Sequence, residues 1–218
     1  MHDTPNLAAP KQASEPVAPR PLILGSTSRY RRELLQRLRL PFEVCAPDVD
    51  ESPLPGEHPA ELSQRLALAK AQAVARQFPE AIVIGSDQVA DLDGESIGKP
   101  GSHERAVEQL RRMSGKTVVF QTAIAVVCAA SGFARQDLAP VRVQFRELSD
   151  AEIENYLRAE QPYDCAGSAK SEGLGISLLS AIESDDPTAL IGLPLIRTNN
   201  LLRQAGLDAL ATQIGAKA

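Results

Sequence analysis

The sequence predicts an α/β fold in which a two-lobed mixed sheet with flanking helices surrounds a central cleft. An apolar run at Leu22–Leu24 is followed by Gly25, hydroxyl residues and leucines at helical spacing, which indicates a strand, a tight turn and a helix. The compact apolar run at 81–85 is typical of a strand buried on both faces. Two longer segments, 117–128 and 139–147, have strand character and are expected to pair antiparallel.

Local signals place the other elements between these strands. Short strands are expected over 41–46 and 176–182, and Asp93-Gly94 is a typical hairpin turn. Helices are expected from about residue 59, over 103–113, from a capping box at 149–152 to about 159, and over 194–204. The buried run at 81–85 should deliver residues 86–89 to its C-terminal end, the edge at which open α/β sheets bind ligands.

Length and composition fit one soluble globular domain. The chain has 218 residues, of which 43% are hydrophobic and 23% are charged, an ordinary globular composition. Residues 1–20 are rich in proline and have little to bury, so we expect a disordered N-terminal tail. The domain should therefore cover residues 21–210 in two lobes, with a C-terminal tail at 211–218.

Charge and cysteine usage exclude several classes of protein. A net charge of −5 argues against binding to a nucleic acid polymer, which normally requires a basic excess. The three cysteines form no CxxC pair and are expected to be free thiols in a reducing compartment. We find neither a membrane span nor the apolar core of a signal peptide. A cytoplasmic protein without a membrane partner is the expectation.

The first strand–turn–helix unit is a candidate phosphate cradle. Free N–H groups and partial positive charge at a helix N-terminus attract anions, and Arg29, Arg31 and Arg32 lie in the first helical turns. Alternatively, Ser26 or Ser28 is an ordinary helix cap and the arginines form a solvated face. The residues of this stretch alone leave both interpretations open.

A second candidate region is the small-residue loop at 164–175, whose glycines and serines are typical of close contact with a ligand or of a plain connection. The scattered histidines and cysteines give no zinc spacing, so any metal should be held by oxygen. Carboxylates, cations and an arginine cradle are the groups that phosphoryl chemistry requires. Residues of these types lie at element edges or in loops, where a cleft could gather them: Arg31, Glu51, Lys70, Asp87, Lys99 and Glu172.

Seven short motifs in register carry a family resemblance. They are Gly25-Ser-Thr-Ser with Arg31, Asp50-Glu-Ser, Lys70-Ala, Ser86-Asp-Gln-Val, Gly98-Lys-Pro, Ala166-Gly-Ser-Ala-Lys-Ser-Glu-Gly and Gly192-Leu-Pro-Leu. From about Leu22 to Gly206 the chain resembles the Maf family of nucleoside triphosphate pyrophosphatases. Any one motif would be weak, but the ordered set is very specific.

The resemblance implies hydrolysis of a nucleoside triphosphate substrate to monophosphate and pyrophosphate with a divalent metal cation (Mg²⁺, Mn²⁺ or Co²⁺). It also implies a fold like that of inosine triphosphatases and, commonly, a homodimer. The implied catalytic residues are Asp87, Lys99 and Lys70, and the implied metal ligands are Glu51 and Asp87. The expected substrate-binding residues are Ser26, Ser28, Tyr30, Arg31, Gln88, Lys170 and Glu172.

Within the family, Ser86-Asp-Gln-Val and the loop with Glu172 resemble the branch that acts on 7-methylguanosine triphosphate. Methylation at N7 leaves the purine cationic, with N1–H and the 2-amino group as donors that a carboxylate can accept. Tyr30 could stack on such a base. Two departures from the family pattern, Gly25 in place of the usual alanine and the additional first 20 residues, leave this chemistry intact.

A function of another class remains open at this point. The same cleft could belong to a nucleotide-responsive regulator of cell division that binds without turnover. The full set of charged residues favours an enzyme, because a binding protein does not need an aspartate to activate water. Release of pyrophosphate would distinguish the two.

Overall fold

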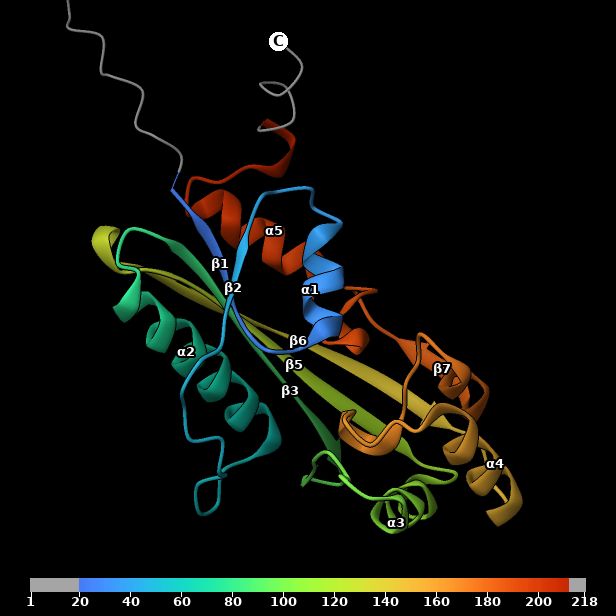
Figure 1. Cartoon of the computed structure of the whole chain (residues 1–218). Coiled ribbons are helices and arrows are strands. Elements are labelled where there is room, and N and C mark those ends of the chain that lie inside the picture. Colours follow the sequence, from blue (N-terminus) through green and yellow to red (C-terminus); the bar gives the residue numbers. More distant parts are fainter. Residues whose placement is uncertain (1–19, 212–218) are drawn as a thin grey trace, which may run out of the picture.

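The computed structural model describes residues 20–211 and has one seven-stranded mixed sheet with helices on both faces (Figure 1). The predicted tails at 1–20 and 211–218 lie outside the described residues, apart from Arg20 and Ala211. The strands are β1 Leu22–Gly25, β2 Glu43–Cys45, β3 Ile82–Leu92, β4 Glu95–Ile97, β5 Thr117–Cys128, β6 Phe133–Phe145 and β7 Leu179–Glu183. The helices are α1 Arg29–Gln36, α2 Pro59–Gln77, α3 His103–Met113, α4 Asp150–Glu160 and α5 Leu195–Gln204.

The sheet combines a parallel half with an antiparallel half. Its strand order is β2-β1-β3-β5-β6-β7, with β4 added beside the far end of β3. β1 is parallel to both β2 and β3, whereas β5, β6 and β7 follow in antiparallel pairs. The long strands β3, β5 and β6 therefore run through both lobes of the molecule (Figure 1).

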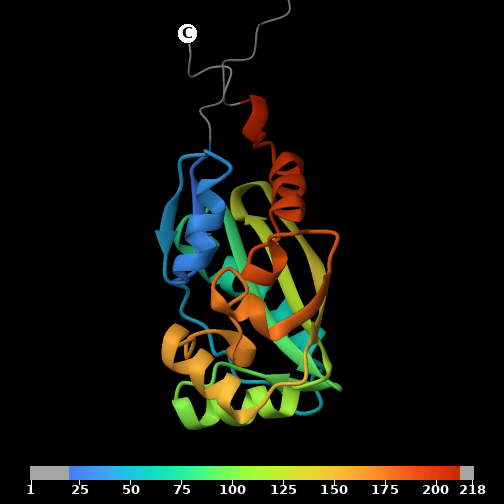
Figure 2. The ribbon, with the colours of Figure 1, turned by 90° about the vertical axis from the view of Figure 1, so that its right-hand side faces the viewer.

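The three largest apolar cores form around these long strands. Near β1, helix α2 packs on one face of the sheet, and α1 and α5 pack on the other. At the opposite end, α3 and α4 lie side by side over a separate core that includes Phe120, Phe145 and Leu157 (Figure 2). The two-lobed mixed sheet with flanking helices is thus confirmed.

A break in pairing along one edge of β3 separates the lobes. The register of β1 with β3 ends at Gly25 beside Gly85, and the register of β4 with β3 begins at Ala90. In the recorded pairings of residues 20–211, the intervening stretch 86–89 has a strand partner only on its other edge, where it faces β5. The central cleft opens at this four-residue gap.

Helix α2 lies unusually close to β3 just before the gap. A Cβ atom on Gly85 would lie 2.2 Å from the backbone oxygen of Ala67 and 2.5 Å from the backbone nitrogen of Ala71. Only glycine permits this approach. The contact brings Lys70, the α2 residue just before Ala71, close to the start of the gap, where it reaches Asp87.

Most expected elements occur where predicted, and the differences have local causes. β3 continues to Leu92 instead of ending near residue 85, so Asp87 lies inside a strand rather than after one. β7 begins at Leu179, because residues 176–178, expected to be extended, belong to a 3₁₀ helix at Leu174–Leu178. A backbone bond from Ile176 N to Gly173 O and a bond from Ser177 Oγ to Leu174 O hold that turn.

Two smaller expectations concern thiols and membranes. Cys45, Cys128 and Cys165 are all free cysteines, as predicted. Across residues 20–211, the helices are too short or too polar to cross a bilayer.

Candidate active site

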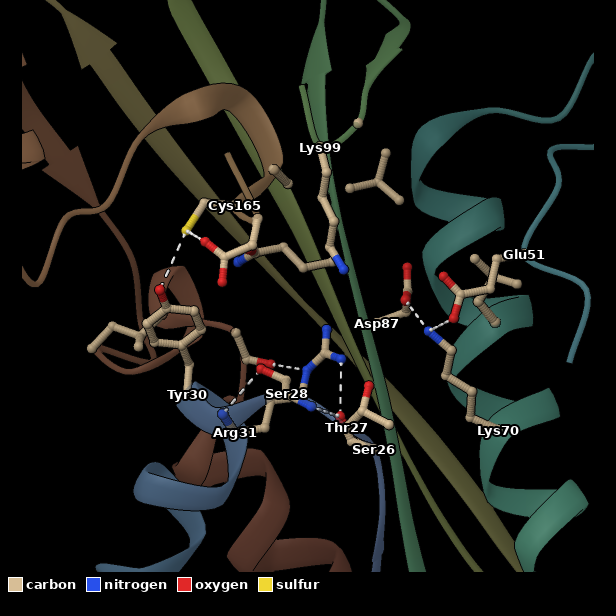
Figure 3. Close-up of a pocket in the computed structure, with 18 of the residues that line it drawn as sticks. Ser26, Thr27, Ser28, Tyr30, Arg31, Glu51, Lys70, Asp87, Lys99 and Cys165 are labelled. Carbon is tan, nitrogen blue, oxygen red and sulfur yellow. Dashed lines mark hydrogen bonds and ion pairs between the residues drawn. The ribbon is translucent and has the colours of Figure 1, made fainter. Parts of the chain in front are cut away.

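A pocket of about 670 Å³ occupies the gap beside β3. The loops that reach it are the turn after β1, the loop with Glu51, the Gly98-Lys99 segment after β4, the loop at 164–172 and the turn at 190–192 (Figure 3). The pocket gathers all but one of the predicted site residues, namely Ser26, Ser28, Tyr30, Arg31, Glu51, Lys70, Asp87, Gln88, Lys99 and Glu172. Lys170 is the exception.

A buried lysine between two carboxylates lies at the centre of the pocket. Lys70 Nζ is 2.6 Å from Asp87 Oδ1 and 2.8 Å from Glu51 Oε1 (Figure 3). The side chains of Lys70 and Asp87 are 6% and 11% exposed, whereas that of Glu51 is 58% exposed. Removing one partner from such a buried pair would leave an uncompensated charge, so the two side chains depend on each other.

Glu51 reaches this lysine from a loop that is fastened to α2. Arg65 binds Glu57 through two hydrogen bonds and also donates to the backbone oxygen of Ser52. The hydrogen bonds from Arg65 lower the pKa of Glu57 to about 2. Burial opposes ionisation of Glu51, but the hydrogen bond and charge of Lys70 outweigh it, so the pKa of Glu51 lies below its usual value.

The turn after β1 and the start of α1 form a cationic wall opposite Asp87. Ser28 caps α1 through its side chain, which accepts from Arg31 N. The guanidinium of Arg31 donates from Nε to Gly192 O at 2.9 Å and from Nη1 to Ser26 Oγ at 3.4 Å. Burial lowers the pKa of Arg31, and the charges of Asp87 and Glu51 act against that shift. Ser28 is therefore a helix cap, as one interpretation expected, but Arg31 lines the pocket instead of a solvated face. The binding of phosphate by this turn stays a prediction.

Two polar residues of β3 hold the far wall of the pocket in place. Ser86 donates to Gly192 O, and Gln88 donates to the backbone oxygens of Ala189 and Leu190. Because neighbouring residues of a strand point to opposite faces, Ser86 and Gln88 face this turn while Asp87 faces α2. Gln88 lines the pocket as predicted, but its amide nitrogen is engaged by the protein.

At the other end of the pocket, Tyr30 lies against Cys165 and Arg29. The Cys165 thiol donates to Tyr30 Oη at 3.8 Å (Figure 3). Arg29 Nη2 donates to the same oxygen at 2.6 Å. The Arg29 guanidinium also covers one face of the ring, 4.7 Å from its centroid. Burial raises the pKa of Cys165 to about 11 and also raises that of Tyr30.

Glu172 lines the same end of the pocket, and its carboxylate is exposed. Throughout residues 20–211, no side chain or backbone N–H is recorded as donating a hydrogen bond to it. Lys170, two residues earlier, turns away from the pocket, and its Nζ lies 2.5 Å from Glu160 Oε1. The structure therefore joins Lys170 to α4 instead of to the predicted binding residues.

The carboxylates present fit a divalent cation only if other oxygen ligands join them. Within the described residues, no group of three or more histidine, cysteine or acidic side chains could hold a metal ion. Glu51 and Asp87 nevertheless converge on one cation, the Lys70 ammonium. Mg²⁺ in proteins is commonly bound by one or two carboxylates plus substrate phosphates and water. This donor set agrees with a metal that arrives with a phosphorylated ligand.

Sequence reasoning missed several residues that line the pocket. Thr27 and Cys165 lie within motifs already noted, and Leu190 and Ile191 immediately precede the Gly192 motif. Their positions inside or directly before those motifs were the available signal. Leu62 and Leu66 on α2 also line it, although helical spacing alone predicts that they belong to the core.

Comparison with known proteins agrees with this arrangement. The family model described as "Maf-like protein" matches residues 21–205. A protein of Polaromonas sp. named "7-methyl-GTP pyrophosphatase" is 68% identical over 213 residues, 97% of this chain and 97% of that protein. Proteins with the same name from Cupriavidus pinatubonensis and Bordetella pertussis are each 59% identical, over 85% and 89% of this chain and 93% and 97% of their own lengths. The chain belongs to the Maf family.

Proposed function

We propose that this protein is a nucleoside triphosphate pyrophosphatase that cleaves the α–β phosphoanhydride of 7-methyl-GTP. The observation that carries the proposal is the buried Lys70–Asp87 pair in one pocket with Arg31, Lys99 and Glu172. This pocket has a catalytic carboxylate and phosphate-binding cations at one end and a free carboxylate at the other. The names of the Maf relatives support the same substrate.

The triphosphate lies along the cationic side of the pocket. Lys70 is already neutralised by two carboxylates, whereas Lys99 is recorded in no ion pair with residues 20–211 and Arg31 binds only uncharged oxygens. Their positive charges are therefore available to phosphate oxygens. The N-terminus of α1, behind Ser26 and Ser28, adds its partial positive charge.

Asp87 is the general base for the attacking water. Its Oδ1 is held by Lys70, and its second oxygen takes a proton from water as the new bond to the α-phosphorus forms. The bond from the α-phosphorus to the bridging oxygen then breaks, and the electron pair leaves with pyrophosphate. Lys99 and Arg31 neutralise the charge that develops on this leaving group. The products are a nucleoside monophosphate and pyrophosphate.

Glu51 and Asp87 are the residues that would hold a divalent cation, with phosphate oxygens completing its ligands. When bound, such a cation supplies charge neutralisation on the phosphates. Glu51 also fixes Lys70 from the solvent side, which keeps the ammonium directed at Asp87. The proposal also includes Mg²⁺, Mn²⁺ or Co²⁺ as the metal and a homodimer as the assembly.

Recognition of the base takes place at the Tyr30 end of the pocket. Glu172 accepts hydrogen bonds from N1–H and the 2-amino group of the methylated guanine and opposes its positive charge. Tyr30 offers the ring face that Arg29 does not cover. The Arg29 guanidinium repels a positively charged purine and so favours a neutral one, whereas the Glu172 carboxylate favours the charged one. The balance between Arg29 and Glu172 therefore influences selectivity.

The test uses the purified full-length chain with Mg²⁺, Mn²⁺ or Co²⁺ and a panel of nucleoside triphosphates. We expect 7-methyl-GTP to give 7-methyl-GMP and pyrophosphate with a higher kcat/KM than GTP, dTTP or UTP. A chelator should abolish the release. Release of inorganic phosphate with a diphosphate product would contradict cleavage at the α–β bond.

The same panel tests the regulatory alternative. A protein that binds 7-methyl-GTP in equilibrium dialysis but releases no pyrophosphate with any of the three metals would be a binding protein without turnover. That result would overturn the assignment of Asp87 as a general base.

A further inference from the structure

We infer that Glu160, at the C-terminal end of α4, is a positioning residue that sets the selectivity for the base by fixing the loop that carries Glu172. The inference rests on the proposed function. Glu160 is not among the residues that line the pocket, so it acts through the loop and not by touching the nucleotide.

The Glu160 carboxylate makes two hydrogen bonds to this loop, one at each side of Glu172. Its Oε1 accepts from Lys170 Nζ at 2.5 Å, and its Oε2 accepts from Leu174 N at 2.8 Å. The side chains of Glu160 and Lys170 are only 15% and 22% exposed. Charge-assisted bonds with little solvent contact are stronger than surface ion pairs.

The loop between these two contacts is a tight turn. Gly173 N donates to Lys170 O at 3.1 Å, so residues 170–173 form a four-residue turn with Glu172 in its third position. A Cβ atom on Gly173 would lie 2.7 Å from Glu160 Oε2. The turn thus rests directly on the Glu160 carboxylate, and a side chain at 173 would separate them.

A second residue of α4 holds the start of the same turn. Tyr156 lies one helical turn before Glu160 and accepts a hydrogen bond from Lys170 N at 3.0 Å. Tyr156 is 3% exposed and belongs to the core beneath α3 and α4. Residues four apart share a helix face, so one face of α4 forms a rigid platform for the turn.

This platform explains how an exposed carboxylate can select a base. No recorded hydrogen bond from residues 20–211 restrains the Glu172 side chain, so its position depends on the backbone beneath it. A displacement of about 1 Å weakens an oriented pair of hydrogen bonds severely. Glu160 therefore controls discrimination between bases, while the phosphates remain bound at the other end of the pocket.

The substitution Glu160→Gln tests this role with almost no change in shape. A glutamine keeps one acceptor oxygen but places an NH₂ donor against Lys170 Nζ or Leu174 N. We expect the ratio of kcat/KM for 7-methyl-GTP to that for GTP to fall about tenfold. The fall should come from a higher KM for 7-methyl-GTP, with kcat for GTP near the wild-type value.

A double-variant cycle shows whether Glu160 acts through Glu172. If it does, Glu160→Gln in a Glu172→Gln background changes the selectivity ratio by less than about twofold, because the two effects do not add. Glu183→Gln is the matched control, since Glu183 also forms an ion pair, in its case with Arg142, but lies on β7 and is exposed. It should leave the ratio at the wild-type value.

Amide hydrogen exchange gives a readout that is independent of catalysis. Exchange over residues 171–175 should be at least about tenfold faster in Glu160→Gln than in the wild type or the control. Unchanged exchange would overturn the inference whether or not the protein cleaves nucleotides. Equal losses of kcat/KM for 7-methyl-GTP and GTP, or effects that multiply in the cycle, would also overturn it, whereas failure of the wild type to cleave any nucleotide would overturn the proposed function.

Discussion

The two ends of the pocket are built in different ways. At the phosphate end, Asp87 and Lys70 come from the interior of a strand and a long helix, and both side chains are largely buried. At the base end, Cys165 and Glu172 come from a loop rich in glycine and serine. Glu160 and Tyr156 support that loop from a single helix face.

Under the proposed function, this difference separates chemistry from selectivity. Groups that transfer protons and bind phosphates must hold their geometry, and regular elements supply that rigidity. A loop that rests on a few hydrogen bonds can change its sequence without disturbing the general base. Substitutions at the phosphate end should therefore affect turnover and folding, and substitutions at the base end should affect the choice of nucleotide.

The largest expected effect comes from Asp87→Asn. Removing the carboxylate should lower kcat for 7-methyl-GTP about 10³-fold, since a general base typically contributes about 10²- to 10⁴-fold. Pyrophosphate release measures the rate, and far-ultraviolet circular dichroism checks folding. Near wild-type turnover in a folded variant would contradict the role of Asp87.

A second substitution tests the rigidity of the phosphate end without touching a charged group. Gly85→Ala would force α2 away from β3 and should lower the free energy of unfolding by about 3 kcal/mol. The control is Gly98→Ala, because a Cβ atom on Gly98 would meet no atom within 4 Å. Urea denaturation of both variants gives the comparison, and equal stabilities would show that the approach of α2 is not tightly packed.

At the base end, Glu172→Gln should change selectivity and spare the chemistry. An amide NH₂ would face the donors of the guanine, so the preference for 7-methyl-GTP over GTP should fall about tenfold. Steady-state kinetics with both nucleotides measures the ratio. If the ratio stays constant while kcat collapses, Glu172 belongs to the reaction and not to base recognition.

The mildest probe of the base end is the pH dependence of Cys165 alkylation. Burial raises the pKa of this thiol to about 11, so it is protonated at neutral pH and the reactive thiolate is scarce. Its reaction with iodoacetamide should accelerate about tenfold per pH unit until the pKa is reached. Mass spectrometry of the Cys165 peptide, with and without bound nucleotide, follows the rate. A plateau that begins near pH 9 would show an ordinary, unburied thiol.

Local sequence signals predicted the helices well, because their leucine and alanine spacing coincides with the faces that are buried. The same signals predicted too short a strand for β3, because the polar residues Asp87 and Gln88 interrupt its apolar pattern where the strand borders the pocket. The start of β6 was missed because residues from Phe133 to Asp137 are mostly exposed and give no apolar alternation.

The sequence identified most residues of the site, but it did not predict all of the contacts between them. Ordered motifs identified Asp87, Lys70 and Glu172, which the pocket brings together. The partnership between Lys170 and Glu160 was not predictable, because a glutamate on an amphipathic helix resembles any solvated charge. Only the folded loop shows which acidic residue of α4 lies beneath it.

The interrupted edge of β3 also bears on how the protein avoids aggregation. An open strand edge invites pairing with another chain, but here the stretch without a partner strand on this side covers only residues 86–89 and is flanked by β1 and β4. An intruding strand would have to enter a slot only four residues long, and regular pairing beyond it is blocked at both ends. The molecule can thus leave this part of the strand edge unpaired beside the pocket while it denies that edge to neighbouring chains.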